Sequence, residues 1–275
     1  MTTATEIDWR TVSLPGIDSS TVAIVLGAGG AIGGATARAL ADMGASVAVA
    51  TRDLDRSKKL AAEIAGNGST GPVLPVVADL AAEGSLPAMV AEVSDRVGAP
   101  TVLVNCAAIA ARHADVADVT RSDVSTLFDV NVVGAYEAVS AVTPYMRAAG
   151  YGRIVNVASV AGLRAMPGNS AYGITKVAVI GLTAHLAVEL AGKGITVNSV
   201  SPGQTPTRLR GIDEPAGTPP EPANAGNTNI PLGRRGLLDD YVGAILFLSS
   251  DLVGYITGVD IPIEGGVRLV RAKSY

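Results

Sequence analysis

The sequence has 275 residues, 48% of them hydrophobic and 17% charged, with a net charge of -4 and a pI near 5.2. This acidic balance argues against nucleic acid or an anionic membrane surface as a partner. We find no apolar run with the length to span a bilayer, and acidic residues interrupt the first twenty positions where a secretory leader would be apolar. One cysteine, Cys106, excludes an internal disulfide. These features favour a soluble cytoplasmic protein without a membrane segment.

Short runs rich in Val and Ile alternate with longer amphipathic stretches from Thr21 onwards. The short runs are apolar on both faces, which is typical of parallel strands covered by helices. Pro75 cannot donate a hydrogen bond to a neighbouring strand, so the third strand is expected at the sheet edge. The predicted strands are 21–26, 46–50, 73–77, 101–104, 152–158, 195–200 and 259–263.

Helical patterns separate these strands at 31–43, 53–65, 84–97, 121–149, 170–191 and 238–249. Alternation of this kind predicts an α/β fold with right-handed crossovers. We expect a Rossmann-type, doubly wound parallel sheet of about seven strands with helices on both faces. A single domain should cover 21–275, preceded at 1–20 by an arm or an extra strand. A Pro- and Gly-rich stretch at about 208–230 is expected to be a substrate loop, or alternatively an insertion without a role in binding.

Glycines gather directly after the first strand, in the segment 27–34 (GAGGAIGG). Glycine lets the backbone turn sharply and approach a pyrophosphate, and the N-terminus of the following helix supplies amide donors. The position between a strand and a helix favours a dinucleotide site over a purely structural turn. The residues assigned to the cofactor here are Gly27, Gly29, Gly30, Ala31, Ile32 and Gly33.

Arg52 follows the second strand and bears on the choice of cofactor. An acidic residue in this place would bind the ribose 2′-hydroxyl of NAD, whereas an arginine accommodates the 2′-phosphate of NADP. Arg52 offers a planar fork, and Thr51 brings no repelling carboxylate. NADP(H) is therefore favoured, with NAD(H) and an exposed helix-start cation as the alternatives. Asp79, next to Leu80 in the same site, is placed to bind the adenine amino group or to cap the following helix.

Tyr172 and Lys176 stand four residues apart on a predicted helix, which puts both on one face. An ammonium near a phenol favours the phenolate and lowers a pKa that is otherwise near 10. A tyrosine with such a neighbour can exchange a proton with a carbonyl or alcohol oxygen. Ser159 ends the fifth strand, at the edge of the sheet where ligands bind, and its hydroxyl can hold the substrate oxygen.

With these residues in place, the chain resembles the short-chain dehydrogenase/reductase family of the compact single-domain type, and its 3-oxoacyl reductase-like members. The resemblance covers about 21–266. Besides the glycine turn, Ser159 and the Tyr-x-x-x-Lys pair, its marks are 105–108 (NCAA), 130–132 (VNV), 201–203 (SPG), 231–235 (PLGRR), 247–250 (FLSS), 255–258 (YITG) and 264–266 (EGG).

This resemblance implies a catalytic set of Asn131, Ser159, Tyr172 and Lys176. Lys176 would also bind the nicotinamide ribose, and Asn131 would hold a water that relays protons to solvent. Asn105 would stabilise the central sheet. The family's helices at 121–149 and 170–191 commonly pack across subunits, which implies a homotetramer, or else a dimer. The further cofactor contacts that it implies are Asn105, Ala107, Pro202, Gly203, Thr205 and Thr207.

The chain departs from the family pattern within the glycine turn. Leu26 stands where threonine is usual, and Ala31 replaces the middle glycine. Gly30 occupies a position that is often basic in members using NADP, which leaves Arg52 as the main phosphate ligand. The segment 105–108 reads Asn-Cys-Ala-Ala instead of Asn-Asn-Ala-Gly. These departures concern the cofactor preference more than the reaction.

The expected function is hydride transfer between NADP(H) and a small-molecule ketone or secondary alcohol. An NAD-dependent alcohol dehydrogenase of the same family is one alternative. A cofactor-binding regulator is another, although it would be expected to lack one of the four proton-transfer residues. Epimerases of this fold usually have a larger C-terminal region. The substrate pocket is expected at 110–112, 163–166, Gln204 and 208–230.

Three residues with reactive side chains receive no functional assignment. Cys106 is expected to pack as a small core residue. His113 is expected to be an exposed loop residue, and His185 to pack or to face a neighbouring subunit. Two isolated histidines and one cysteine do not have the spacing of a metal site.

Overall fold

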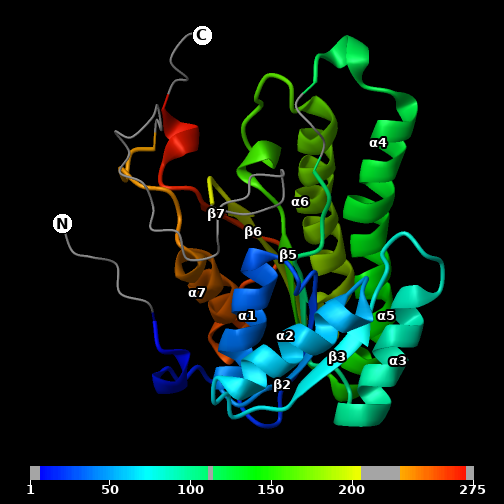
Figure 1. Ribbon diagram of the computed structural model, residues 1–275, viewed down its shortest axis with the longest axis vertical. Helices are drawn as coiled ribbons and strands as arrows, with labels where there is room; N and C mark the ends of the chain where they lie inside the picture. The colour runs from blue at the N-terminus through cyan, green and yellow to red at the C-terminus, as the bar shows by residue number, and fades with distance from the viewer. Residues whose placement is uncertain (1–6, 111–113, 206–229, 271–275) are drawn as a thin grey trace.

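The computed structural model describes residues 7–110, 114–205 and 230–270. The described residues form one sheet of seven parallel strands in the order β3-β2-β1-β4-β5-β6-β7 (Figure 1). This order confirms the predicted Rossmann-type sheet, with the topological switch between β1 and β4. The strands are β1 Val22–Leu26, β2 Ser46–Thr51, β3 Val73–Val77, β4 Val102–Asn105, β5 Gly152–Val157, β6 Ile195–Pro202 and β7 Asp260–Ile263.

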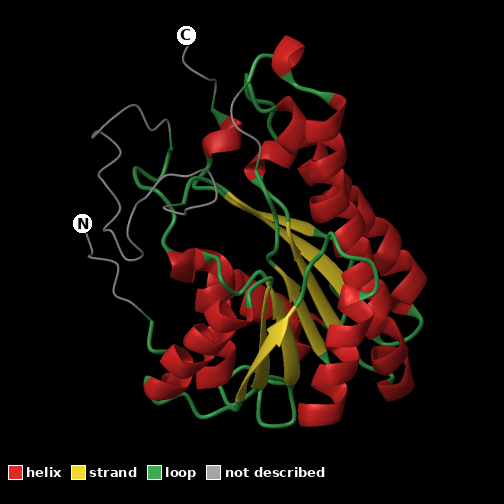
Figure 2. Ribbon diagram, turned by 45° about the vertical axis from the view of Figure 1, so that its right-hand side comes forward, coloured by secondary structure: helices red, strands yellow, loops and turns green. Residues whose placement is uncertain are grey.

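Helices cover both faces of the sheet, which lies between them in Figure 2. Because side chains alternate along a strand, Val22 and Ile24 of β1 enter one core while Ala23 and Val25 enter the other. One core is closed by α1 Ala31–Asp42, α2 Leu54–Gly66 and α7 Leu238–Ser249. The other is closed by α3 Ser85–Val97, α5 Gly134–Ala149 and α6 Ser170–Ala191, with α4 Arg121–Phe128 packed on α6.

Pro75 lies in β3, which pairs only with β2 and forms one edge of the sheet. The expectation that proline places this strand at an edge is therefore confirmed. An edge strand needs ladder donors on one side alone, so a residue without an N–H is tolerated there.

The helix expected over 121–149 is interrupted. A π-helical turn, Asp129–Val133, separates α4 from α5. Such turns insert an extra residue into the helix and are frequent at functional sites. Here the turn holds Asn131, whose side chain bonds both main-chain groups of Ile109 in the loop after β4. Hydrophobic periodicity did not predict this interruption because it gives no signal for a side-chain bond to a loop from another part of the chain.

The described part of the N-terminal arm is not a strand. It forms a 3₁₀ turn, Trp9–Thr11, packed against the core between α1 and α7. Trp9 Nε1 donates to Asp239 Oδ1 at 3.2 Å, and the Ile7 N–H donates to Asp239 Oδ2 at 3.0 Å. The extra-strand alternative is wrong for residues 7–20, because one buried tryptophan docks this segment on a helix instead of the sheet.

α6 is, among the described helices, the one with the length and apolar composition of a membrane span. Sequence analysis overlooked it because Lys176 interrupts the apolar run. The helix packs on β6, and Leu186 and Leu190 lie in the core beneath the sheet. It is a core helix of the Rossmann-type fold.

Candidate active site

The carboxyl ends of the parallel strands meet at one edge of the sheet, and the predicted site residues lie along that edge. This placement follows from the topology alone, because every strand runs in the same direction. Gly27 follows β1, Thr51 ends β2, Asp79 follows β3, Asn105 ends β4, Ser159 follows β5 and Pro202 ends β6.

The glycine turn leaves space that a side chain would fill. Gly27 has a φ of 71°, and a Cβ there would lie 2.6 Å from the Cα of Ala107. A Cβ on Gly33 would lie 2.5 Å from the carbonyl oxygen of Gly27. α1 begins after Gly30 without a side-chain cap, so its first amides remain available to an anion. The turn therefore fits the pyrophosphate of a dinucleotide, with Ala31 and Ile32 in the first helical turn.

A polar atom without a partner is buried beside this turn. Asn105 is 4% exposed, and its Oδ1 has no hydrogen-bond partner among the described residues. Its register partner in β5, Asn156, has an Oδ1 in the same situation. An unpaired buried oxygen costs about 1–3 kcal/mol, so this position suits a donor from a ligand. Nearby, Leu80 is buried against Gly134 at the start of α5.

The end of β2 turns directly into α2. The Thr51 hydroxyl donates to the Asp53 carbonyl at 2.5 Å, and the Asp53 carboxylate accepts the N–H groups of Asp55 and Arg56 as the helix cap. Arg52 is exposed beside the turn. Asp79 Oδ1 accepts the Ala81 N–H at 3.0 Å, so it closes a local turn. It does not cap α3, because the N-cap residue of that helix is Gly84.

Arg56 is a functional candidate that sequence analysis missed. Its guanidinium donates a hydrogen bond to the Gly29 carbonyl, and a Cβ on Gly29 would lie 2.5 Å from its Nε. The side chain thus crosses from α2 to the glycine turn and lies over it. The available signal was its spacing of four residues from Arg52 on an early helical turn.

Tyr172 and Lys176 lie together at the start of α6, each 3% exposed. The Lys176 Nζ is 5.8 Å from the centroid of the Tyr172 ring and donates to the Val157 carbonyl at 2.9 Å. Burial lowers the pKa of the Lys176 ammonium to about 8, because the charged form loses its hydration. Ser159, two residues beyond β5, accepts the Ala161 N–H at 3.2 Å and begins a short 3₁₀ turn that packs on α6.

Asn131 connects two parts of this site. Its Oδ1 accepts the Ile109 N–H at 2.8 Å, and its Nδ2 donates to the Ile109 carbonyl at 2.9 Å and to Thr175 Oγ1 at 3.1 Å. Both amide hydrogens are therefore used by the protein. The residue ties the loop after β4 to α6 at the position between Tyr172 and Lys176.

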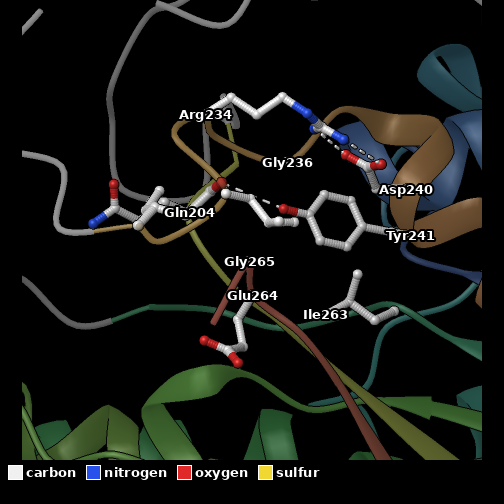
Figure 3. A pocket seen from close by; sticks show the side chains of 10 residues that line it. Gln204, Arg234, Gly236, Asp240, Tyr241, Ile263, Glu264 and Gly265 are labelled. Carbon is white, nitrogen blue, oxygen red and sulfur yellow. Dashed lines mark hydrogen bonds and ion pairs between the residues drawn. The ribbon is translucent and has the colours of Figure 1, made fainter. Parts of the chain in front are cut away.

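The segment 202–205 lies at the end of β6 and reaches α7. The Gly203 N–H donates to the Ile263 carbonyl at 2.9 Å, and a Cβ on Gly203 would lie 2.7 Å from the Glu264 Cα. The Tyr241 hydroxyl donates to the Gln204 carbonyl at 3.3 Å (Figure 3). Tyr241 was not selected from the sequence, because a single tyrosine on an apolar helix face carries no motif. Thr207 lies outside the described residues.

The predicted substrate pocket is described only in part. Leu163 and Met166 are 38% and 37% exposed, and between them Arg164 donates to the Val267 carbonyl. These side chains form an apolar rim on the loop that precedes Tyr172. Ala110 lies at the end of a described segment, whereas 111–112, His113 and most of the loop at 208–230 lie outside the described residues.

The remaining reactive side chains have ordinary surroundings. Cys106 packs against the core, and desolvation raises the pKa of its thiol to about 12, so it stays protonated at neutral pH. His185 is exposed on α6.

Comparison with known proteins identifies the class. Residues 27–268 match the family model described as enoyl-(acyl carrier protein) reductase. The 3-oxoacyl-[acyl-carrier-protein] reductase FabG of Thermotoga maritima is 35% identical over 248 residues, which cover 90% of this chain and 97% of that protein. D-threitol dehydrogenase of Mycolicibacterium smegmatis is 34% identical over 250 residues, covering 90% and 93%.

A solved structure agrees with this result. Gluconate 5-dehydrogenase from Burkholderia cenocepacia, in complex with NADP and tartrate, superposes with a TM-score of 0.82 at 29% identity, covering 96% of this chain and 99% of that one. The chain belongs to the short-chain dehydrogenase/reductase family. It is an oxidoreductase that acts on alcohol or carbonyl groups.

The buried ammonium predicts a specific dependence of stability on pH. An unfolded lysine has a pKa near 10.5, whereas Lys176 in the fold has a pKa of about 8. Between these values the unfolded chain binds more protons, so the contribution of Lys176 to stability rises with pH. Relative to Lys176→Met, the wild type should gain up to about 1.4 kcal/mol per pH unit above pH 8.

Chemical unfolding of both proteins at several pH values from 7 to 9.5 measures this difference. Lys193→Met, at an exposed position, is the control and should follow the wild type at every pH. Parallel curves for the wild type and Lys176→Met would contradict the lowered pKa.

Proposed function

We propose that this chain is an NADP(H)-dependent ketoreductase or alcohol dehydrogenase in which Tyr172 is the general acid and base. The observation that carries the proposal is the buried pair on α6. The Lys176 ammonium lies 5.8 Å from the Tyr172 ring centroid, away from water, and Ser159 stands at the same edge of the sheet. A positive charge in such a low-dielectric place acts strongly on a neighbouring phenol.

Each member of the catalytic set has a separate role. In the reductive direction the Tyr172 hydroxyl gives its proton to the substrate oxygen, and the Lys176 ammonium stabilises the phenolate that remains. The Ser159 hydroxyl donates a hydrogen bond to the same substrate oxygen. When bound, the nicotinamide cofactor supplies the hydride, or accepts it in the oxidative direction.

Asn131 completes the proposed proton path. Because both hydrogens of its Nδ2 are bonded within the protein, a relay water would donate a hydrogen bond to an oxygen of this residue. The π-helical turn at 129–133 shifts the usual main-chain pairing, which makes its carbonyl groups candidates for that contact. The water would pass protons between Lys176 and solvent.

The cofactor would lie along the carboxyl edge of the sheet. The glycine turn and the uncapped N-terminus of α1 suit the pyrophosphate, while Pro202, Gly203 and Thr205 would border the nicotinamide. Arg52 directly follows β2, where a 2′-phosphate is recognised, and Arg56 brings a second guanidinium from α2 to the Gly29 carbonyl. The bound NADP of gluconate 5-dehydrogenase agrees with this preference.

The substrate is proposed to be a small ketone or secondary alcohol. Relatives of this chain include a 3-oxoacyl-[acyl-carrier-protein] reductase and D-threitol dehydrogenase. The exposed Leu163 and Met166 beside the catalytic helix favour a substrate with an apolar portion. A spectrophotometric screen of ketones and secondary alcohols with NADPH and NADP identifies the compound class.

Replacement of the proposed acid tests the mechanism. Tyr172→Phe should lower kcat by roughly 10²–10⁴-fold, because proton transfer loses its positioned group, while the Kd for NADPH stays within about twofold. Initial rates on a substrate from the screen and NADPH fluorescence titration measure the two quantities. Tyr255→Phe, at a fully exposed tyrosine, is the control. Undiminished turnover of Tyr172→Phe would remove this residue from the mechanism.

The two arginines should determine the cofactor preference. Loss of either charge-assisted contact is expected to raise the Kd for NADPH about tenfold or more, with little change for NADH. Arg52→Ala and Arg56→Ala are titrated with both cofactors. Lys58→Ala removes a cation from the same helix two residues away and should change neither value. Equal effects on NADPH and NADH would exclude that arginine from the phosphate site.

We further propose a homotetramer, or else a dimer, in the cytoplasm. An exposed stripe runs along α6 through Ile174, Val177 and Val188, and Tyr136 is exposed on α5. Apolar side chains in this pattern on one helix favour burial against a second copy. His185 lies on the same exposed side. The single cysteine, with its protonated thiol, suits a reducing compartment.

A charge in this stripe should separate the subunits. Val188 is 81% exposed in the isolated chain, so Val188→Glu should leave the fold intact and lower the mass measured by light scattering. Val116→Glu places the same charge at a residue that is 77% exposed elsewhere, and should keep the mass of the wild type. An unchanged mass for Val188→Glu would exclude α6 from the interface.

A further inference from the structure

The first turn of α7 contacts three segments that are far apart in the sequence. Asp239 accepts hydrogen bonds from the N-terminal arm, as described above. Asp240 accepts two bonds from the Arg234 guanidinium, at 2.5 and 2.9 Å. Tyr241 reaches the segment 202–205, which we assign to the nicotinamide half of the cofactor. Three consecutive side chains therefore fix one helix end against three parts of the molecule.

The Tyr241 hydroxyl is buried directly against the cofactor segment. The residue is 1% exposed, and its hydroxyl donates to the Gln204 carbonyl at 3.3 Å and shares a side-chain hydrogen bond with Thr205. Burial raises the pKa of Tyr241 to about 12, so the phenol stays protonated and remains a donor over the working range of an enzyme. Thr205 Oγ1 in turn lies 3.4 Å from the Gly203 carbonyl.

The Tyr241 hydroxyl occupies the space that a side chain at position 236 would fill, and Gly236 has none. A Cβ at Gly236 would lie 1.9 Å from the Tyr241 oxygen and 2.5 Å from Cζ. No side chain can occupy that space while the tyrosine keeps its position. The Gly236 N–H also donates to the Gln204 carbonyl, at 3.0 Å. One carbonyl thus receives two donors, and the absence of a side chain at Gly236 allows both to approach.

An ion pair and a main-chain hydrogen bond form a frame around this contact at the start of α7. The Arg234–Asp240 pair is bidentate, and Asp240 Oδ2 also accepts the Leu237 N–H at 2.7 Å. Figure 3 shows these side chains around a cavity of about 140 Å³ that Gln204 and Glu264 also line. The bonds from Tyr241 and Gly236 to the Gln204 carbonyl tie the segment 202–205 to this charge-assisted frame, while the Gly203 N–H ties it to β7.

We propose that Tyr241 is a positioning residue that holds the main chain of 202–205 in the conformation that binds the nicotinamide half of the cofactor, with Gly236 as its steric complement. The inference rests on the proposed function, since it takes this segment as part of the cofactor site. It assigns no chemical step to Tyr241, which acts through Gln204 and Thr205.

Binding of the whole cofactor is compared with binding of its adenosine half. Tyr241→Phe removes the hydroxyl and keeps the ring, so the Kd for NADPH should rise roughly threefold to tenfold, the effect of one hydrogen bond. The Kd for 2′,5′-ADP, which has no nicotinamide, should stay unchanged. Fluorescence titration and calorimetry measure the two affinities. Tyr255→Phe, at a fully exposed tyrosine, is the matched control and should alter neither.

A double-mutant cycle tests the steric complement. Gly236→Ala in the wild type should weaken NADPH binding at least as much as Tyr241→Phe, because the new methyl displaces the hydroxyl. In a Tyr241→Leu background there is no hydroxyl or Cζ to displace, so Gly236→Ala should add less than a twofold change. This non-additivity is specific to the contact. The unfolding midpoint of each variant establishes that the protein is folded.

Each result decides between defined outcomes. Equal NADPH affinity in Tyr241→Phe and wild type, or an equal loss of affinity for NADPH and 2′,5′-ADP, overturns the positioning role. Additive effects of the two substitutions on the Kd for NADPH would mean that Gly236 and Tyr241 act independently. That result overturns the role of Gly236 as the steric complement of Tyr241. A wild type that binds neither NADPH nor NADH refutes the proposed function itself. If Tyr241→Phe does not fold, Gly236→Ala in the wild type supplies the decision, because it should weaken binding of NADPH and leave binding of 2′,5′-ADP unchanged.

Discussion

The Lys176 ammonium is buried at the carboxyl edge of the sheet, and the chemistry of the site depends on how that charge is compensated. Removing an ammonium from water is unfavourable unless donors and charge are matched. Lys176 has three N–H donors, and its hydrogen bond to the Val157 carbonyl uses one of them. Burial lowers the pKa of Lys176 to about 8, because its charge is only partly compensated by this bond. In the proposed mechanism, hydroxyl groups of the nicotinamide ribose would accept hydrogen bonds from the other two donors.

The same logic of complementary space applies to the glycines. Gly27 and Gly33 allow backbone atoms to approach where a Cβ would collide, and the result is a concave turn at the helix N-terminus. Gly236 allows a tyrosine hydroxyl, instead of backbone, to approach. In both places glycine is important because its missing side chain leaves space for a neighbouring group.

Much of this architecture could be predicted from the sequence, because the spacing of hydrophobic residues indicates which faces of the strands and helices are buried. The strands from Val22 to Ile263 lie within a few residues of their predicted bounds, and Pro75 indicated the edge position of β3. The π-helical turn around Asn131 could not be predicted, since it arises from a side chain that bonds a loop brought close only in the folded chain. Contacts of this kind have no periodic signal.

The N-terminal arm and the two missed site residues show the same limit. Trp9 docks on Asp239, which is 230 positions away, and Tyr241 reaches Gln204, which is 37 positions away. Each contact is determined by packing between elements, so a sequence reveals the residue type without its partner. The proximity of Tyr172 and Lys176 could be predicted because the two residues are one helical turn apart.

Arg56 explains a departure that the sequence left open. The glycine turn has Gly30 at a position that is often basic in related NADP-using proteins, so a cation expected within the turn is missing. The guanidinium of Arg56 arrives instead from α2 and bonds the Gly29 carbonyl, one residue away from that position. Positive charge is thus delivered to the turn from a neighbouring helix. A guanidinium has five donors, and one bond to Gly29 leaves the others able to meet a phosphate. For the proposed NADP(H) site, a positive charge therefore reaches the turn from α2 although the local motif has none.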